Sequence, residues 1–145
     1  MLSKKYAALD NLFSRYIRTQ TIREYGGCAR CLTPKHDVYK EDGTKYPAWK
    51  QLQTAHFWGR RNTNVRFDPD NAIGLCGACH LYFHAHPLEF VEFFKARLGE
   101  QAFEMLRARA NEVGRPDKKA IELWLKKELK EMGAKECYEG LRKKN

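Results

Sequence analysis

The sequence contains no long apolar run. None of its hydrophobic segments approaches the about 20 residues that a helix needs to cross a bilayer, and we therefore expect no membrane partner. The basic N-terminus is not followed by an apolar segment with a small-residue cleavage site, so no secretory signal is predicted. Internal repeats and low-complexity tracts are also missing. The lack of a membrane-spanning run and of a secretory signal predicts a cytoplasmic protein.

Acidic residues are scarce relative to basic ones. The chain has 18 aspartates and glutamates against 27 lysines and arginines, which gives a formal net charge of +9. A surplus of this size favours an anionic partner, and nucleic acid is the commonest one for a small basic protein. The alternative is a basic surface that only keeps the protein in solution. Hydrophobic residues make up 43% of the chain, which excludes wholesale disorder.

Cysteines are few, and they are placed unevenly. Four of the five form two Cys-x-x-Cys pairs, Cys28 with Cys31 and Cys76 with Cys79. Disulfides are rare in a reducing cytoplasm, whereas two such pairs have the spacing that holds one Zn²⁺ in a tetrahedron of thiolates. Four thiolates leave no open position for water, so this zinc is expected to be structural. The alternative is four unrelated buried thiols. Cys137 remains unpaired, and we interpret it as an ordinary thiol on a helical tail.

The sequence on either side of the cysteine pairs predicts helices. Apolar residues recur at helical spacing from Ser3, a possible N-cap, up to Gly26. Further helices are predicted to begin at the second cysteine pair, to run over residues 87–98 and 100–112, and to start near residue 116. In the last helix, the residues expected to face inward are Ile121, Leu123, Trp124, Leu125 and Leu129.

Strand signals are confined to the middle of the chain. Residues 32–50 are predicted to form an irregular insertion with little strand, in which residues 37–41 could pair as a hairpin. Side chains then alternate, so His56 is expected to project from a strand on the same side as Leu52 and Thr54. The fold class is therefore predicted to be α+β, with one domain for the whole chain.

Three polar residues stand in order around the second cysteine pair. His56 lies in the predicted strand, Asn71 precedes the pair by five residues, and His80 follows it directly. This arrangement resembles the HNH nuclease motif in its zinc-supported, treble-clef-like form, over residues from about 28 to about 84.

The resemblance implies an architecture within one domain of residues 1–145. A small ββα-metal core, with zinc knuckles formed by the four paired cysteines, would occupy about residues 26–86. An N-terminal helix over about residues 1–25 and a helical C-terminal region over about residues 87–145 would flank this core.

The resemblance also implies a role for each polar residue. His56 would act as general base on water, Asn71 would hold the loop that orients His56, and His80 would bind a catalytic Mg²⁺ or Mn²⁺. Imidazole suits the first role, because its unperturbed pKa near 6.5 allows it to be neutral and accept a proton at working pH. Many members of the family have a second metal ligand directly before the base, where this chain has Ala55. His84, one helical turn after His80, could take its place, as in the colicin type.

The loop after the predicted base is basic. Arg60, Arg61 and Arg66 lie where a substrate backbone would pass, and we predict that they contact phosphates. The alternative is that they are solvated surface arginines. Phe57 and Trp58 could stack on bases, but large aromatic residues this near a metal site are expected to pack in the core.

The layout is also similar to that of the phage NinG (Rap) recombination nucleases, which act on branched DNA. The resemblance thus implies a metal-dependent HNH endonuclease that hydrolyses DNA phosphodiester bonds, with branched DNA as one candidate substrate and the host cytoplasm as its location if a phage encodes it. The alternative is a zinc-stabilised nucleic-acid-binding module without catalysis. A third hypothesis is an adaptor that binds proteins through its C-terminal helices. The oligomeric state is left open.

Overall fold

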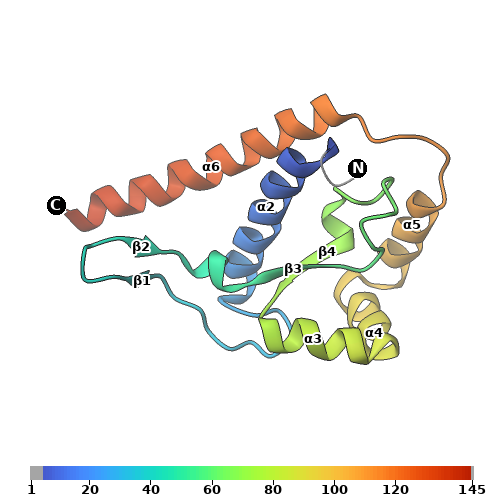
Figure 1. Ribbon diagram of the computed structural model, residues 1–145, viewed down its shortest axis with the longest axis horizontal. Helices are drawn as coiled ribbons and strands as arrows, with labels where there is room; N and C mark the ends of the chain where they lie inside the picture. The colour runs from blue at the N-terminus through green and yellow to red at the C-terminus, as the bar shows by residue number, and fades with distance from the viewer. Residues whose placement is uncertain (1–4, 145) are drawn as a thin grey trace.

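The computed structural model describes residues 5–144, with side chains described up to residue 133. Ser3, the expected N-cap, and the side chain of Cys137 lie outside this description. The chain folds into helices and two small antiparallel sheets, which confirms the α+β prediction (Figure 1). The elements are, in chain order, α2 (Ala7–Tyr25), β1 (Val38–Tyr39), β2 (Lys45–Tyr46), the 3-10 turn η1 (Ala48–Gln51), β3 (Gln53–His56), the 3-10 turn η2 (Pro69–Asn71), β4 (Ala72–Leu75), α3 (Gly77–Ala85), α4 (Pro87–Leu98), α5 (Glu100–Ala110) and α6 (Lys118–Lys144).

Strands β3 and β4 form the sheet that carries His56. They pair antiparallel, with His56 opposite Ala72, and α3 follows β4 directly, so the predicted strand is confirmed. The side chains along this segment differ in burial. Leu52 and Ala55 are buried in the core, whereas Thr54 and His56 are half-buried. Leu52 follows the η1 turn with an extended backbone. A β-carbon on Gly74, the residue opposite Thr54, would lie 3.1 Å from Leu52 Cδ1, so Leu52 lies on the side of the strand that carries Thr54 and His56, as predicted.

Residues 32–50 form little strand, as predicted. The two-residue strands β1 and β2 pair antiparallel, with Val38 opposite Tyr46. Figure 1 shows this β1–β2 hairpin projecting from the rest of the fold.

Helix α2 packs its apolar face against the β3–β4 sheet and α6. Leu9, Phe13 and Ile17 are buried at the four-residue spacing that the sequence predicts. The helix approaches β4 closely at Gly74, whose N–H donates to Thr21 Oγ1 at 2.9 Å. A β-carbon at residue 74 would lie only 2.8 Å from that oxygen, so the close approach requires glycine.

The last helix, α6, lies across α2 (Figure 1). Leu125 and Met132, seven residues apart, are buried, and the Trp124 ring packs edge-on against Tyr16 with ring centroids 5.0 Å apart. The sequence predicts that Leu123 also faces inward, but its side chain is 71% exposed, and this prediction is wrong. Two residues along a helix turn through about 200°, so Leu123 points away from the side that buries Leu125.

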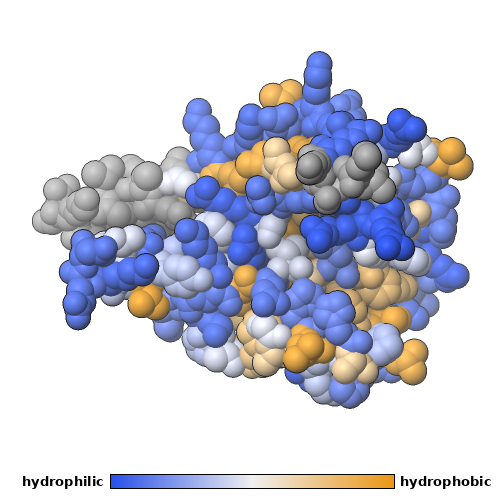
Figure 2. Space-filling model, in the orientation of Figure 1, coloured by the Kyte–Doolittle hydropathy of each residue, from blue (hydrophilic) through white to orange (hydrophobic). Residues whose placement is uncertain are grey.

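Helices α3, α4 and α5 close the other side of the fold. Their predicted positions agree with the structure, and Phe83, Phe94 and Phe103, one from each helix, are buried in one cluster beside the strands. Figure 2 shows that hydrophilic residues cover most of the visible face, including the β1–β2 hairpin. None of the described helices combines the length and the apolar character needed to span a bilayer.

Candidate functional site

The four predicted zinc ligands lie together. The sulfur atoms of Cys28, Cys31, Cys76 and Cys79 are all within 4.8 Å of one another, and those of Cys31 and Cys76 are 3.9 Å apart. The first pair comes from the turn after α2, and the second pair from the start of α3. Cys28 and Cys79 are buried, whereas Cys31 is exposed. The cluster can therefore hold one metal ion at the edge of the core.

The turn that carries Cys28 and Cys31 has an unusual backbone. A β-carbon on Gly27 would lie 2.0 Å from the Thr33 carbonyl oxygen, so only glycine fits there. That carbonyl accepts a hydrogen bond from the Cys28 N–H at 3.3 Å. Leu32 has a φ of 60°, in the left-handed region that residues with a side chain rarely adopt. These features close the turn so that both sulfurs reach the same cluster.

The four thiols have different surroundings. Hydrogen bonds from Thr33 lower the pKa of Cys31 to about 6, whereas burial raises the pKa of Cys79 to about 12. The Arg30 guanidinium opposes the second effect, because it donates to Cys79 Sγ at 3.5 Å. The same guanidinium lies over the Tyr82 ring, 3.9 Å from its centroid. A cation in the cluster would favour the thiolate form of all four cysteines.

A hollow of about 430 Å³ opens beside strand β3. It brings together side chains from α2, from β3 and the loop that follows, and from α3. The lining residues are Asp10, Ser14, Thr54, His56, Gly59, Arg60, His80 and His84. Four of the predicted site residues therefore meet here, namely the three histidines and Arg60.

Helix α2 contributes two residues that the sequence analysis missed, Asp10 and Ser14. The Ser14 hydroxyl lies 2.7 Å from the Thr54 hydroxyl and so ties α2 to strand β3. A signal for them is present in the sequence. Asp10, Ser14 and Arg18 recur every four residues and form a polar stripe beside the apolar face of the helix.

The ring of His56 has a defined tautomer. Its Nε2 lies 3.2 Å from the Arg66 carbonyl oxygen. Because a carbonyl only accepts, Nε2 carries the proton and neutral His56 has its free lone pair on Nδ1. Burial lowers the pKa of His56 below the ordinary 6.5, against the opposing effect of the Arg66 carbonyl. His56 is therefore neutral near pH 7, with Nδ1 as its basic atom.

Asn71 is fully buried and holds the loop after β3. Its Oδ1 accepts from the Trp58 N–H at 2.7 Å, and its Nδ2 donates to the carbonyls of Trp58 and Val65, both at 3.0 Å. The side chain thus ties together two segments of the loop. Arg66, whose carbonyl holds the His56 ring, directly follows Val65. The amide of Asn71 therefore fixes the support of His56.

His80 and His84 lie one turn apart on α3, with ring centroids 4.8 Å apart. His80 Nδ1 is 2.8 Å from Gln53 Oε1 on strand β3. An amide oxygen only accepts, so Nδ1 carries the proton and Nε2 of neutral His80 is free to bind a metal. Metal-binding histidines usually donate their other ring N–H in this way. His84 is exposed to solvent.

Ala55 leaves a gap in the expected ligand set. Its side chain is 1% exposed and packs in the core, so the position before His56 faces away from the hollow. The carboxylate in the hollow comes instead from Asp10. Outside the four cysteines, the described residues contain no other group of three or more His, Cys, Asp or Glu side chains that could hold an ion.

Arg66 differs from its expected role. The phosphate-contact prediction requires an accessible guanidinium, but Arg66 is only 4% exposed. Its Nε and Nη2 donate to the two carboxylate oxygens of Asp10 at 2.9 and 2.5 Å, and its Nη1 donates to the Arg60 carbonyl at 2.9 Å. This geometry corrects the prediction, because a buried bidentate ion pair leaves no face for a substrate phosphate. Arg66 holds the loop against α2.

The Asp10 ion pair gives a prediction for Arg66→Ala. We expect this substitution to destabilise the protein by about 3–5 kcal/mol, because it removes the bidentate partner of a largely buried carboxylate and leaves it only the more distant, exposed Arg60. Arg61→Ala, at an exposed position of the same loop, should change the free energy of unfolding by no more than about 0.5 kcal/mol. Urea denaturation of both variants measures the difference. Equal unfolding midpoints for Arg66→Ala and wild type would contradict the structural role.

Arg60 and Arg61 are both exposed. Arg60 borders the hollow, and its guanidinium is 3.9 Å from Asp10 with a side chain that is 62% exposed. Both side chains are accessible to a substrate. Their contact with phosphates stays a prediction.

Phe57 and Trp58 pack in the core, as predicted. The Phe57 ring lies 5.1 Å from Phe94 and 5.3 Å from Phe103, measured between centroids. Trp58 packs beside Val65 and other apolar residues next to α5. Both rings therefore anchor the start of the loop after β3 in the hydrophobic core.

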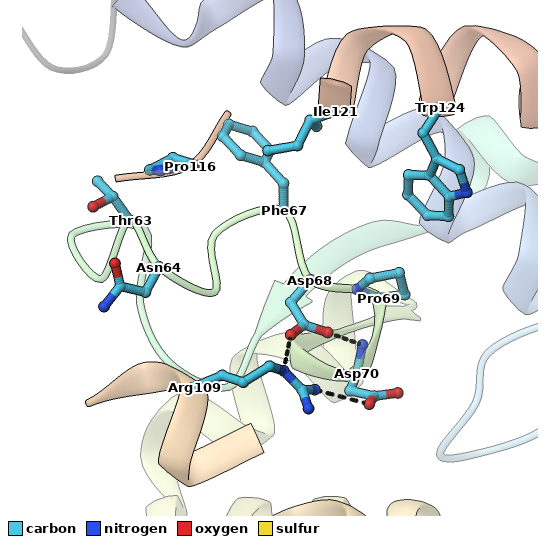
Figure 3. Close-up of a pocket in the computed structure, with 10 residues that line it drawn as sticks. All are labelled: Thr63, Asn64, Phe67, Asp68, Pro69, Asp70, Arg109, Pro116, Ile121 and Trp124. Carbon is cyan, nitrogen blue, oxygen red and sulfur yellow. Dashed lines mark hydrogen bonds and ion pairs between the residues drawn. The ribbon is translucent and has the colours of Figure 1, made fainter. Parts of the chain in front are cut away.

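The far end of the loop is fixed by Arg109 of α5. Its guanidinium pairs with Asp68 at 2.7 Å and with Asp70 at 3.0 Å (Figure 3). These residues border a second hollow of about 530 Å³, into which Phe67 and Trp124 also face. No histidine or cysteine lines it. We therefore assign it to the packing of the loop against α5 and α6, and not to chemistry.

Comparisons with models of protein families, with curated proteins and with solved structures found no match to this chain. The case for a function therefore depends on the residues and the geometry described above.

Proposed function

We propose that this protein is a metal-dependent HNH endonuclease that hydrolyses DNA phosphodiester bonds. The observation that carries the proposal is the meeting of His56 from β3 with His80 and His84 from α3 in one hollow, beside a buried Asn71 that supports the His56 loop. The hydrogen bonds of His56 and His80 leave free the ring nitrogen that each proposed role requires. The net charge of +9 and the exposed arginines after β3 favour nucleic acid as the substrate.

We further propose that the ion of the cysteine cluster is Zn²⁺. Zinc–sulfur bonds of about 2.3 Å in a tetrahedron place the sulfurs about 3.8 Å apart. The separation of 3.9 Å between the Cys31 and Cys76 sulfurs fits this value. The other sulfur atoms lie within 4.8 Å of one another. Small rotations of the cysteine side chains would bring them to the tetrahedral separation. Because four thiolates fill the tetrahedron, this ion is structural, and the reaction belongs to the histidine-lined hollow.

In the proposed reaction His56 is the general base. Its Nδ1 removes a proton from water while the water oxygen attacks phosphorus, and the bond from phosphorus to the leaving oxygen breaks. The leaving oxygen takes a proton from solvent, so the products are a phosphomonoester and an alcohol. Asn71 acts at a distance, because it holds Val65 and thereby the Arg66 carbonyl that keeps the proton of His56 on Nε2.

The residues that would hold the catalytic Mg²⁺ or Mn²⁺ are His80 and His84. The free Nε2 of His80 fits this role. When bound, the ion would stabilise the negative charge that develops on the phosphate in the transition state. The oxygens of Asp10 already bind Arg66, so water and substrate oxygens would complete the ligand set.

Burial of His56 predicts the pH dependence of cleavage. A general base must be unprotonated, so the rate falls as pH drops through the pKa of His56. Burial and the nearby Arg60 and Arg66 lower that pKa, while the Arg66 carbonyl and Asp10 raise it, with a net shift below 6.5. We therefore expect the acid limb of kcat/KM, measured at saturating metal between about pH 5 and pH 8, to have its midpoint below 6.5. An acid limb centred above pH 7 would contradict this assignment of the base.

One cleavage assay tests the proposal. Supercoiled plasmid, linear duplex and a four-way junction are incubated with the protein and Mg²⁺, Mn²⁺ or EDTA. Ni²⁺ is included because imidazole ligands suit transition metals. The proposal expects cleavage of at least one substrate with a divalent ion and none in EDTA. Branched DNA as the preferred substrate requires faster cutting of the junction than of the linear duplex.

A nucleic-acid-binding module without catalysis is the second candidate. The observation that favours it is the buried Ala55, which leaves two histidines as the only imidazole ligands beside His56 in the hollow. This candidate expects tight DNA binding in EDTA and no cleavage with any of the three metal ions. The same assay therefore separates the two functions.

A further inference from the structure

A second cationic site lies on helix α2, beside the hollow. Arg18 is half-buried, and its Nε donates to the Ser14 carbonyl at 3.2 Å while its Nη1 approaches the Leu52 carbonyl at 3.5 Å. Its guanidinium lies over the Trp49 ring, 4.8 Å from the centroid. Among the described side chains, no carboxylate forms an ion pair with Arg18. The guanidinium is therefore held in place by neutral groups.

A charge held in this way favours an anionic ligand. A guanidinium has five N–H donors, and the two carbonyls use two of them. The remaining donors match the oxygens of a phosphate, which arginine binds in a bidentate manner. Burial without a counter-ion also lowers the pKa of Arg18. A bound anion would compensate the partly desolvated charge of Arg18. The Trp49 ring under the guanidinium fixes the orientation of its N–H donors before the anion binds.

Two further cations surround the same ring. Arg15 lies 5.2 Å and Lys50 lies 5.6 Å from the Trp49 centroid. Both are exposed, and neither forms an ion pair with a described carboxylate. A half-exposed aromatic ring among three cations has the composition of a single-strand or backbone binding platform. We call Arg15, Arg18, Trp49 and Lys50 the Trp49 platform.

The Trp49 platform is contiguous with the histidine-lined hollow. Ser14 lines the hollow, and its carbonyl holds Arg18. Figure 1 shows η1, which carries Trp49, beside α2. From Asp10 in the hollow to Arg18 the helix advances by about 12 Å at about 1.5 Å per residue. This distance corresponds to roughly three to four nucleotides at a rise of about 3.4 Å.

We infer that the Trp49 platform binds a backbone phosphate of the DNA strand about three to four nucleotides from the bond that is cut, with Arg18 as the bidentate ligand. The inference rests on the proposed function and adds a substrate contact to the same site. The platform touches no reacting atom, so it contributes to binding of the strand and not to the chemical step.

The test compares R18Q with R107Q in the full-length protein. Arg107 is an exposed arginine on α5, outside the hollow and the platform, and is the matched control. Affinity for a fluorescent duplex is measured in EDTA, so that binding is independent of cleavage. R18Q is expected to weaken binding about tenfold. It should also reduce, by about one, the slope of the logarithm of the binding constant against the logarithm of the salt concentration. R107Q should bind like wild type. With a divalent ion, R18Q should raise KM and leave kcat unchanged.

A length series locates the contact. On duplexes that end fewer than about three nucleotides from the cut on the platform side, wild type and R18Q should bind equally, because the contacted phosphate is missing. If R18Q is poorly folded by circular dichroism, the double variant R15A/K50A replaces it, since both side chains are exposed. That variant is expected to weaken binding to full-length duplex in the same salt-dependent way.

Other outcomes would overturn the inference. If R18Q and R15A/K50A bind full-length duplex as tightly as wild type, the platform is not a DNA contact, although cleavage by wild type would still support the nuclease. Unchanged DNA affinity together with lost binding of polyglutamate would assign the platform to an acidic protein. A wild type that binds DNA but never cuts it would remove the proposed nuclease and overturn the stated distance from the cut bond, while weaker binding by R18Q would still show that the platform contacts DNA.

Discussion

Cys28→Ser is expected to remove the bound metal and to unfold the protein. Cys28 is fully buried, and its sulfur belongs to the cluster in which all four sulfurs lie within 4.8 Å. A structural zinc ion contributes about 10–16 kcal/mol of binding free energy, which is as large as the whole free energy of unfolding of a typical domain, about 5–15 kcal/mol. The cluster also joins the turn after α2 to the start of α3, so its loss separates two parts of the core.

Elemental analysis and circular dichroism check this prediction. Wild type should contain one zinc per chain, and Cys28→Ser should contain none and show no cooperative thermal transition. Cys137→Ser, which changes the cysteine outside the two pairs, is the matched control and should keep both the zinc and the transition. Chelation of the wild-type protein with excess EDTA should reproduce the effect of Cys28→Ser. A folded wild-type protein without any bound metal would contradict the metal centre.

The elements near the cysteine pairs could be predicted because their signals are local. Gly26 ends α2 with a φ of 72°, and Pro87 and Gly99 bound α4, as residues with special backbone preferences do. The metal ligands could also be predicted from the cysteine spacing without knowledge of the fold. Two pairs of thiols with the same internal spacing have few reasons to occur other than a shared ion.

The functions of charged residues could not be predicted in the same way, because they depend on contacts between distant segments. Arg60, Arg61 and Arg66 are equivalent in the sequence, yet only Arg66 is buried. The difference is made by Asp10, which lies 56 residues earlier and accepts from the Arg66 guanidinium. Asp10 belongs to the polar stripe of α2, but the stripe alone does not show which distant residues it meets. Asp10 enters the hollow because α2 packs across β3, where Ser14 and Thr54 meet.

Leu123 shows the limit of helical periodicity. Residues 121–125 contain four large apolar side chains, and a helix can bury only one face of them. Leu125 is buried, while Leu123 is 71% exposed. The choice between the faces is made by the partner helix α2, whose Tyr16 ring contacts Trp124. The sequence of α6 alone does not contain this information.

His56→Ala is expected to lower the cleavage rate by about 10²- to 10⁴-fold, the usual contribution of a general base. Nδ1 of His56 is the free basic nitrogen of the ring, since Nε2 is held by the Arg66 carbonyl. Zinc content and DNA affinity in EDTA should stay close to wild type, because the substitution removes neither a thiolate nor a cation. His36→Ala, at an exposed histidine outside the hollow, should cleave at the wild-type rate.

His80→Ala separates the metal role from the base role in the same assay. Loss of the imidazole that has its Nδ1 fixed by Gln53 should also abolish cleavage, but a higher concentration of Mn²⁺ should restore part of the rate if the ion is only bound more weakly. Raised Mn²⁺ should not rescue His56→Ala, since no base remains. His84→Ala should resemble His80→Ala if it compensates for Ala55. Wild-type cleavage by His56→Ala would remove His56 from the base role, and rescue of both His56→Ala and His80→Ala by metal would show that the two histidines share one task.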